Sequence, residues 1–265
     1  LRCKYRNIKI LNFDITVFAP KGRGEAGTLE MVHFLKKVLE ERYDGICISP
    51  IADLRVEKLL QKMAEKGVEV IFILSAFDSV PYRTLIGTDS YQCGRSTGEA
   101  VREALGADGA VGIIKWKDNL IETVEDRYHG VVDVLKENRI PYYDMTGPGE
   151  PTAEEATKLT DRLLTEHPDI SVLCATNVGW GLAFARYIKS KGKKVKLVTV
   201  DFTDEVGEFM KAGYVDAAIA QRPESWGSMT LEKIEAVFEG QSIPKTIDTG
   251  TYPVTPANIR IYVKD

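Results

Sequence analysis

Short, almost continuous apolar runs alternate with longer amphipathic stretches along this chain, and that alternation limits the possible folds. The apolar runs are rich in Val and Ile and occupy residues 15–19, 45–49, 68–74, 109–114, 141–145, 170–175, 195–200 and 215–220. Runs without polar alternation are typical of strands that are buried on both faces. The pattern therefore predicts an α/β protein with parallel sheets covered by helices.

The stretches between these runs have helical periodicity. Residues 28–43 place apolar side chains at 31, 34, 35, 38 and 39, on one face of a helix. Residues 55–67 end in Gly67, and residues 152–169 begin with Thr152 and Glu155 at the spacing of a capping box. Strands that alternate with such helices predict right-handed crossover connections between parallel strands.

One large sheet or two smaller sheets could hold these strands. Two are favoured, because the pattern restarts at residues 109–114 after a glycine-rich break at 105–112. The chain also runs into the apolar segment 15–19 without a preceding strand and helix. Either the first strand-helix unit is absent, which we favour, or residues 1–10 are irregular.

Composition and motifs exclude several classes of function. The net charge is −4, and the basic run 191–196 is interpreted as a helix end that leads into a strand, so we expect no binding to nucleic acid. No apolar run approaches the ~20 residues of a membrane span, and no signal-peptide pattern is present. The sequence contains no CxxC, HExxH or P-loop motif. Its histidines, which are His33, His129 and His167, are assigned to helices. We therefore expect no metal, no cofactor and no enzymatic activity.

Polar side chains follow several of the apolar strands at the point where each strand ends. They are Asp89, Asn177, Asp201 and Gln221. Ligands of open α/β sheets bind beyond the carboxyl ends of the strands. Carboxylates and carboxamides can bond the hydroxyl groups of a polyol, so we expect these residues to contact a small polar ligand. Asn177 and Asp201 could equally cap the helices that follow them.

Two tryptophans lie near these strand ends. Trp116 follows the apolar run 109–114, and Trp180 comes three residues after Asn177. Indole rings can stack on the C–H face of a sugar, so both are candidate ligand contacts. The alternative is packing at a lobe edge for Trp116 and helix packing for Trp180.

Several ordered motifs resemble the periplasmic sugar-binding proteins of the ribose and glucose type, which share their fold with effector domains of the Lac repressor family. The likeness covers nearly the whole chain from residue 14 onward. The motifs are IGTDSYQCGRSTGEAV (86–101), DRYHGVVDVL (126–135), VTVDFTDEVGEFMKAGYVDAAIAQ (198–221), AAIAQRPESWGSMTLEKI (217–234) and SIPKTIDTGTYPVTPANI (242–259).

The resemblance implies two Rossmann-like lobes joined by a three-strand hinge that closes on a ligand. It places residues 1–107 and 222–248 in the first lobe, and residues 108–221 and 249–265 in the second. Asp89 would contact sugar hydroxyls from the first lobe, Asn177 and Asp201 from the second, and Gln221 from a hinge crossing.

The chain departs from the family pattern at three places. Nothing matches the contacts that relatives make before their first helix. The second-lobe Arg or Asn of the family falls in residues 122–126, which offer Thr123, Glu122 and Glu125 instead. The first-lobe loop gives Ser75 and Asp78 in a shifted pattern. The extra acids raise the hypothesis of a cationic or amino-sugar ligand.

The family implies a solute-binding protein that delivers a sugar or polyol to the membrane permease of an ABC transporter. We expect a monomer located outside the cytoplasm, in the periplasm or lipid-anchored at the cell surface. The alternatives are the extracellular sensor domain of a signalling receptor and the effector domain of a Lac repressor-type regulator.

Overall fold

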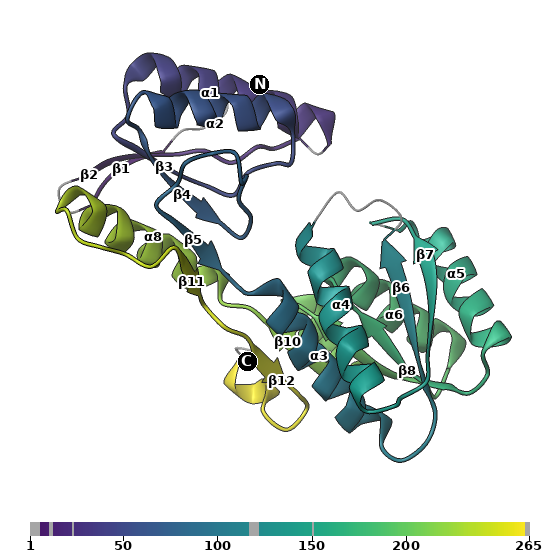
Figure 1. The fold of residues 1–265 in the computed structure, drawn as a ribbon. Coiled ribbons are helices and arrows are strands. Elements are labelled where there is room, and N and C mark those ends of the chain that lie inside the picture. The colour runs from purple at the N-terminus through teal and green to yellow at the C-terminus, as the bar shows by residue number, and fades with distance from the viewer. Residues whose placement is uncertain (1–5, 11–12, 23, 117–121, 150, 263–265) are drawn as a thin grey trace. The chain divides into compact units, whose positions relative to one another are not determined.

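The computed structural model describes residues 6–10, 13–22, 24–116, 122–149 and 151–262, with the side chains of 6–10 and 122 left aside. The chain divides into two compact units, each made of two separate segments. The first unit comprises Leu1–Gly87 and Glu224–Ile247, and the second comprises Thr88–Pro223 and Asp248–Asp265. The prediction of an α/β protein with two parallel sheets is confirmed (Figure 1).

The first unit is built on a four-stranded sheet with the order β11-β5-β4-β3. In chain order its elements are β1 (Arg6–Ile10), β2 (Phe13–Val17), α1 (Glu25–Glu41), β3 (Gly45–Ile48), α2 (Leu54–Glu65), β4 (Glu69–Ile73), β5 (Thr84–Gly87), α8 (Pro223–Phe238) and β11 (Thr246–Asp248). Strands β3, β4 and β5 are parallel.

Alternate side chains of these strands enter different layers of the first unit. Val70 and Phe72 of β4 pack into the cluster of α1 and α2, whereas Ile71 packs against Ile234 of α8. β4 is therefore apolar at the consecutive positions Val70 to Ile73, as expected of a strand that helices cover on both faces.

Residues 15–19 were expected to form a buried strand of the sheet, but the structure differs. β2 pairs antiparallel with β1 in a separate two-stranded ribbon, with Ile8 opposite Ile15. In β2, polar Asp14 and Thr16 alternate with apolar Phe13 and Ile15. This period of two is typical of a half-covered antiparallel strand.

The second unit is built on a six-stranded sheet with the order β12-β10-β9-β8-β6-β7, parallel except for β12. Its elements are α3 (Ser90–Leu105), β6 (Ala110–Trp116), α4 (Glu122–Glu137), β7 (Tyr142–Gly147), α5 (Ala153–Glu166), β8 (Ile170–Ala175), α6 (Val178–Lys191), β9 (Lys196–Val200), α7 (Asp204–Lys211), β10 (Ala217–Ala220), β12 (Tyr252–Val254) and a 3-10 turn (Ile259–Ile261).

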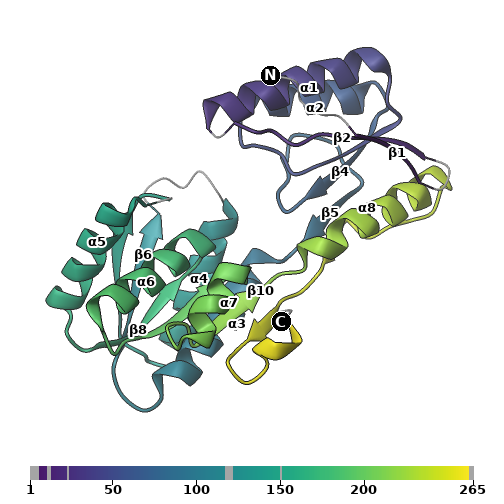
Figure 2. The same ribbon diagram turned by 180° about the vertical axis from the view of Figure 1, so that it is seen from behind.

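Helices cover both faces of this second sheet. Val172 and Cys174 of β8 pack with α3 and α4, and Leu173 and Ala175 pack with α5, α6 and α7. Figure 2 shows α6 and α7 on the side of the sheet that faces the viewer. The capping box expected at the start of α5 is present, because Thr152 and Glu155 bond each other's backbone N–H groups.

The boundary between the units differs from the lobe boundary expected at residue 107. Helix α3 belongs to the second unit, because it packs directly on α4. A Cβ on Gly94 of α3 would overlap the backbone of Arg127, and a Cβ on Gly130 of α4 would overlap the backbone of Tyr91. Small residues at these positions let the two helix backbones touch, and Asp89 is thereby held in the second unit.

Candidate functional site

Four neighbouring strands of the second unit end at the same edge of the sheet. β6, β8, β9 and β10 are adjacent and parallel, so their carboxyl ends lie together. Trp116 is the last residue of β6, and Asn177, Asp201 and Gln221 follow the other three strands. The structure therefore brings these four sequence-predicted residues to one edge, where open α/β sheets bind their ligands.

Asn177 caps helix α6 and still has hydrogen-bonding capacity left. Its Oδ1 accepts a hydrogen bond from the backbone N–H of Trp180 at 3.0 Å, which is the capping alternative that the sequence left open. The residue is 8% exposed, and its Nδ2 is buried without a partner. A buried amide N–H₂ without an acceptor costs free energy, so this group favours the arrival of a ligand oxygen.

Asp201 and Gln221 form a bonded pair at the ends of β9 and β10. The Nε2 of Gln221 donates to the Oδ1 of Asp201 at 2.6 Å, and the Oε1 of Gln221 is buried without a partner. Asp201 has a left-handed backbone with φ of 70°, and its N–H donates to Ile219 O at 2.9 Å. Helix α7 is capped by Thr203 and not by Asp201. The Asp201 carboxylate thus remains available for a ligand.

Asp89 lies at the start of α3 with an exposed side chain. Its Oδ1 accepts a hydrogen bond from the N–H of Gln92 at 2.9 Å, and its own N–H donates to the Oδ1 of Asp248 at 2.9 Å. These two bonds fix the backbone at the N-terminus of α3. The second carboxylate oxygen of Asp89 is the part of the side chain that a ligand could use.

The two tryptophans have different environments. Trp116 is half-buried, its ring lies against Gly149, and its Nε1 is buried without a partner. Trp180 is fully buried in the core, and its Nε1 donates to the carbonyl oxygen of Pro148 at 2.9 Å. The expectation that Trp180 stacks on a sugar is therefore corrected, because its ring packs within the protein. Trp116 stays a candidate.

The three remaining predicted residues are less closely tied to this edge. The carboxylate of Glu125 lies 3.0 Å from the Nζ of Lys115 and 3.2 Å from the Nε2 of His129. Thr123 is half-buried in the first turn of α4. Ser75 follows β4 in the first unit, so it belongs to a different compact unit from the others. The side chain of Glu122 lies outside the described residues.

Sequence reasoning missed Arg127, which it treated only as part of a helix motif. Arg127 is 6% exposed, and its Nη1 donates to the carbonyl oxygen of Thr176, beside Asn177, at 3.4 Å. Its Nε is buried without a partner. A signal was present in the pattern, because Arg127 falls between Val124 and Val131 on the buried face of α4.

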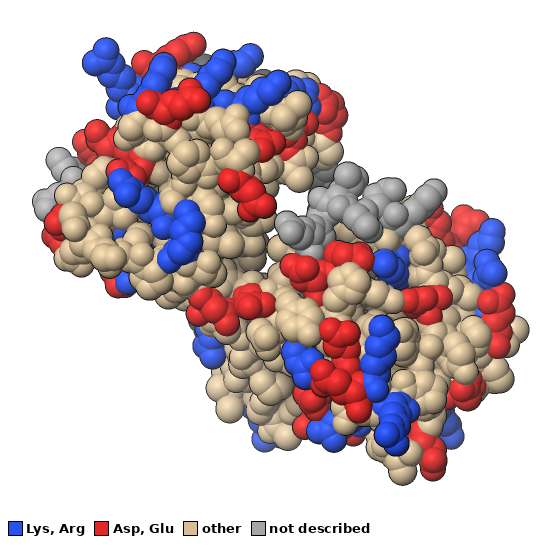
Figure 3. Space-filling model, viewed as in Figure 1, with Lys and Arg blue, Asp and Glu red and all other residues tan. Residues whose placement is uncertain are grey.

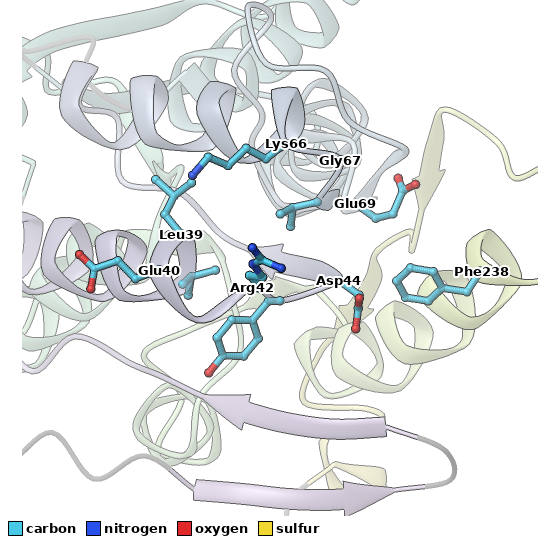
Figure 4. Close-up of a pocket in the computed structure, with 11 residues that line it drawn as sticks. Leu39, Glu40, Arg42, Asp44, Lys66, Gly67, Glu69 and Phe238 are labelled. Atoms are coloured by element: carbon cyan, nitrogen blue, oxygen red, sulfur yellow. The ribbon is translucent and has the colours of Figure 1, made fainter.

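A separate hollow of about 680 Å³ lies in the first unit, between the C-terminal ends of α1 and α2. Figure 4 shows Glu40, Arg42 and Lys66 around it, with Phe238 of α8 on the far side. Asp44 and Glu69, which also line it, stand at the amino ends of β3 and β4. The hollow is thus at the end of the sheet opposite to the usual ligand edge of this fold class.

Three further properties of the described residues were relevant to function: the distribution of surface charge, possible metal ligands and possible membrane-spanning helices. On the face shown in Figure 3, basic and acidic side chains are interspersed over both units. Within the described ranges, no group of His, Cys, Asp and Glu side chains has the arrangement of a metal site. None of the described helices combines the length and apolar character that crossing a membrane requires.

Comparison with known proteins identifies the family. A family profile described as "Periplasmic binding protein domain" matches residues 9–242. The chain belongs to the periplasmic binding protein family. Among its relatives, the ribose import binding protein of Bacillus subtilis is 22% identical over 220 residues, which cover 80% of this chain and 69% of that protein.

Solved structures share the fold of this periplasmic binding protein. A sugar-binding protein of a sugar ABC transporter from Bacillus halodurans matches with a TM-score of 0.81 at 18% identity, over 89% of this chain and 86% of that one. A solute-binding protein from Burkholderia graminis, solved with D-arabinose, matches with a TM-score of 0.77 at 24% identity, over 89% and 84% of the two chains.

Proposed function

We propose that this chain is a solute-binding protein that captures a small sugar or related polyol and delivers it to the membrane permease of an ABC transporter. The observation that carries the proposal is the row of polar side chains after adjacent parallel strands. Asn177 Nδ2 is a free donor there, Gln221 Oε1 is a free acceptor, and Asp201 is a carboxylate. Such a set can both donate to and accept from neighbouring hydroxyl groups.

The ligands of relatives support the same proposal. The relatives are ribose import binding proteins, and one structural neighbour holds D-arabinose. We propose that the ligand is a pentose or a hexose and that it binds with the Trp116 indole beside its ring. Glu125 gives little support to a cationic ligand, because Lys115 and His129 already face it. In this role we expect the protein to act as a monomer outside the cytoplasm. We also expect it neither to catalyse a reaction nor to bind nucleic acid.

A thermal-shift screen tests the proposal. The chain would be heated with D-ribose, D-arabinose, D-allose, D-glucose and D-galactose, each at millimolar concentration. A ligand present at 100 times its Kd stabilises the folded state by about 2.7 kcal/mol through mass action, which is a readily measured rise in Tm. The proposal predicts such a rise with at least one sugar and its loss in Asn177→Ala. A flat response to every sugar would contradict it.

A further inference from the structure

Two tyrosines near the C-terminus stack on each other beside the candidate site. The ring centroids of Tyr252 and Tyr262 lie 5.0 Å apart, and the two ring planes are inclined by 27°. The Phe202 ring meets Tyr262 edge-on, with 6.3 Å between the centroids. The Cζ of Arg222 lies 4.7 Å from the centre of the Tyr252 ring. Aromatic pairs, and cations above aromatic faces, attract each other beyond the gain from burial, so these four side chains form one connected cluster.

The cluster adjoins the hydrogen-bonded Asp201–Gln221 pair along the chain. Phe202 directly follows Asp201, after the end of β9. Arg222 directly follows Gln221, after the end of β10. The pair itself is joined by the bond from Gln221 Nε2 to Asp201 Oδ1 at 2.6 Å. The residue next to each member is therefore in contact with one of the two tyrosines.

The chain between the two tyrosines folds into a turn that its own hydrogen bonds fix. β12 pairs antiparallel with β10, which places Tyr252 opposite Ala220. The Oδ1 of Asn258 accepts from the N–H of Thr255 at 2.8 Å, and its Nδ2 donates to the carbonyl oxygen of Pro253 at 3.0 Å. Figure 1 shows this turn in yellow next to β12. The chain thereby reverses direction after β12 and returns to the Tyr252 ring.

Tyr262 reaches the stack without being part of the core. The 3-10 turn before it is anchored by Ile259, which is 5% exposed and belongs to the core cluster of the second unit. The N–H of Tyr262 donates to the carbonyl oxygen of Ile259 at 2.9 Å. Tyr262 itself is 39% exposed. Its ring therefore supports Tyr252 and Phe202 from the solvent side, and burial alone does not explain its place.

The geometry of the Asp201–Gln221 pair depends on support from its neighbours. Asp201 has a left-handed backbone with φ of 70°, and such a conformation persists only where the surroundings fix it. Phe202, the next residue, is half-buried and packs against the core of the second unit. The Oε1 of Gln221 is buried without a partner, so its direction is set by the bond to Asp201 and by the backbone. A shift of the backbone after either residue would turn both polar groups.

We propose that the C-terminal segment 252–262 is a positioning element for the ligand edge of the second sheet. Its two tyrosines hold the Asp201–Gln221 pair through the residue that follows each member, and they do so without contacting the ligand. This inference rests on the proposed function and assigns the part of the chain that sets the geometry of the pair. Loss of the ring stack should weaken sugar binding although every group that bonds the sugar is still present.

Calorimetric titration of the full chain with D-ribose, D-arabinose, D-glucose and D-galactose tests the inference. We expect Tyr262→Ala to bind the tightest of these sugars at least fivefold more weakly than the wild type. Tyr262→Phe keeps the ring and should bind within twofold of the wild type. The matched control is Tyr143→Ala, which removes a tyrosine stacked on His167 at 3.7 Å near the amino end of β7. It should bind like the wild type, because it lies at the opposite end of the same sheet.

A double-mutant cycle separates positioning from a general loss of structure. If Tyr262 acts through the pair, Tyr262→Ala should weaken binding at least fivefold in the wild type but less than twofold in Asp201→Ala. A merely structural role would weaken binding equally in both backgrounds. Melting without ligand measures whether each variant is folded. If Tyr262→Ala does not fold, Tyr262→Leu keeps the apolar bulk without the ring and takes its place in the same cycle.

The outcomes separate this inference from the proposed function. Wild-type affinity in folded Tyr262→Ala, or an equal loss in both backgrounds, would overturn the positioning role and leave the sugar-binding function standing. An affinity that Tyr262→Phe does not restore would also overturn it, because the ring would then not be the group that acts. If no sugar binds the wild type, the proposed function fails and this inference fails with it.

Discussion

At the scale of single residues, the site depends on side chains that the fold holds in unusual states. Asp201 has φ of 70°, a left-handed conformation that costs a residue with a Cβ about 1–2 kcal/mol. It is held there by its N–H bond to Ile219 O and by the Gln221 amide. Strain at a position that also presents a carboxylate to the ligand edge is typical of a functional residue.

Replacing Asp201 by glycine separates binding from stability. Asp201→Gly removes the carboxylate and the backbone strain together, so we expect sugar affinity to fall about tenfold or more while the Tm stays level or rises. Arg139→Gly is the matched control, because Arg139 has φ of 55° on an exposed turn away from this edge. It should change neither affinity nor fold. Calorimetry and thermal melts measure both, and unchanged affinity in Asp201→Gly would contradict the role of the carboxylate.

Asp126 gives the folding stability of the chain a defined pH dependence. Burial raises its pKa, and the nearby Asp89 and Glu125 carboxylates add to the rise, although His129 opposes it. The folded state therefore holds this proton more tightly than the unfolded chain does. The stability contributed by the protonated form is present at low pH and is lost as pH rises through the raised pKa.

Asp126→Asn should accordingly raise the Tm at pH 7, where the wild-type side chain is a desolvated anion. The gain should shrink as pH falls to about 4 and the wild-type carboxyl takes up its proton. Thermal melts of the two proteins across this range measure the difference. A gain that is constant with pH would show that the substitution acts through something other than ionisation.

At the scale of elements, the contact between α3 and α4 connects the fold to the site. Gly94→Ala would place a Cβ into the backbone of Arg127, so we expect a loss of about 1–3 kcal/mol in the free energy of unfolding and weaker sugar binding. Gly227→Ala on α8 is the control. Nothing lies within 4 Å of its added Cβ, so the change should be neutral or stabilise by about 0.5–1 kcal/mol. Chemical unfolding measures the free energy of unfolding of both variants. Equal changes in Gly94→Ala and Gly227→Ala would argue against the close contact between α3 and α4.

The elements also show what the sequence could and could not predict. Continuous apolar runs predicted the parallel strands, because burial on both faces leaves no room for polar alternation. Thr152 and Glu155 predicted the start of α5, since a capping box depends on local spacing alone. The run at 15–19 was misread, because only tertiary pairing shows that β2 joins β1 and not the sheet.

The candidate site was predictable only in part. Asn177, Asp201 and Gln221 could be placed at one edge, because polar residues that follow parallel strands converge there. Trp180 could not be assigned correctly, since helix periodicity does not tell a core indole from a ligand contact. The position of Arg127 on the apolar face of α4 could have predicted that it is buried, but only the structure shows that its Nε lacks a partner.

At the scale of the whole molecule, the candidate ligand-binding residues are divided between the two α/β units. The second unit holds the row formed by Trp116, Asn177, Asp201 and Gln221, and the first unit holds Ser75. Because the chain belongs to the periplasmic binding protein family, we interpret the row of side chains in the second unit as a solute-binding site. The central claim is therefore that the carboxyl ends of β6, β8, β9 and β10 bind a sugar.

Calorimetric titration of the tightest sugar into the wild type, Asn177→Ala and Gln221→Ala tests that claim most directly. The account predicts one sugar bound per wild-type chain. It predicts a loss in each variant of about 1–3 kcal/mol of binding free energy, since each change leaves a hydrogen bond unmade. Binding of equal affinity in all three proteins would contradict the account, as would a wild type that binds none of the sugars.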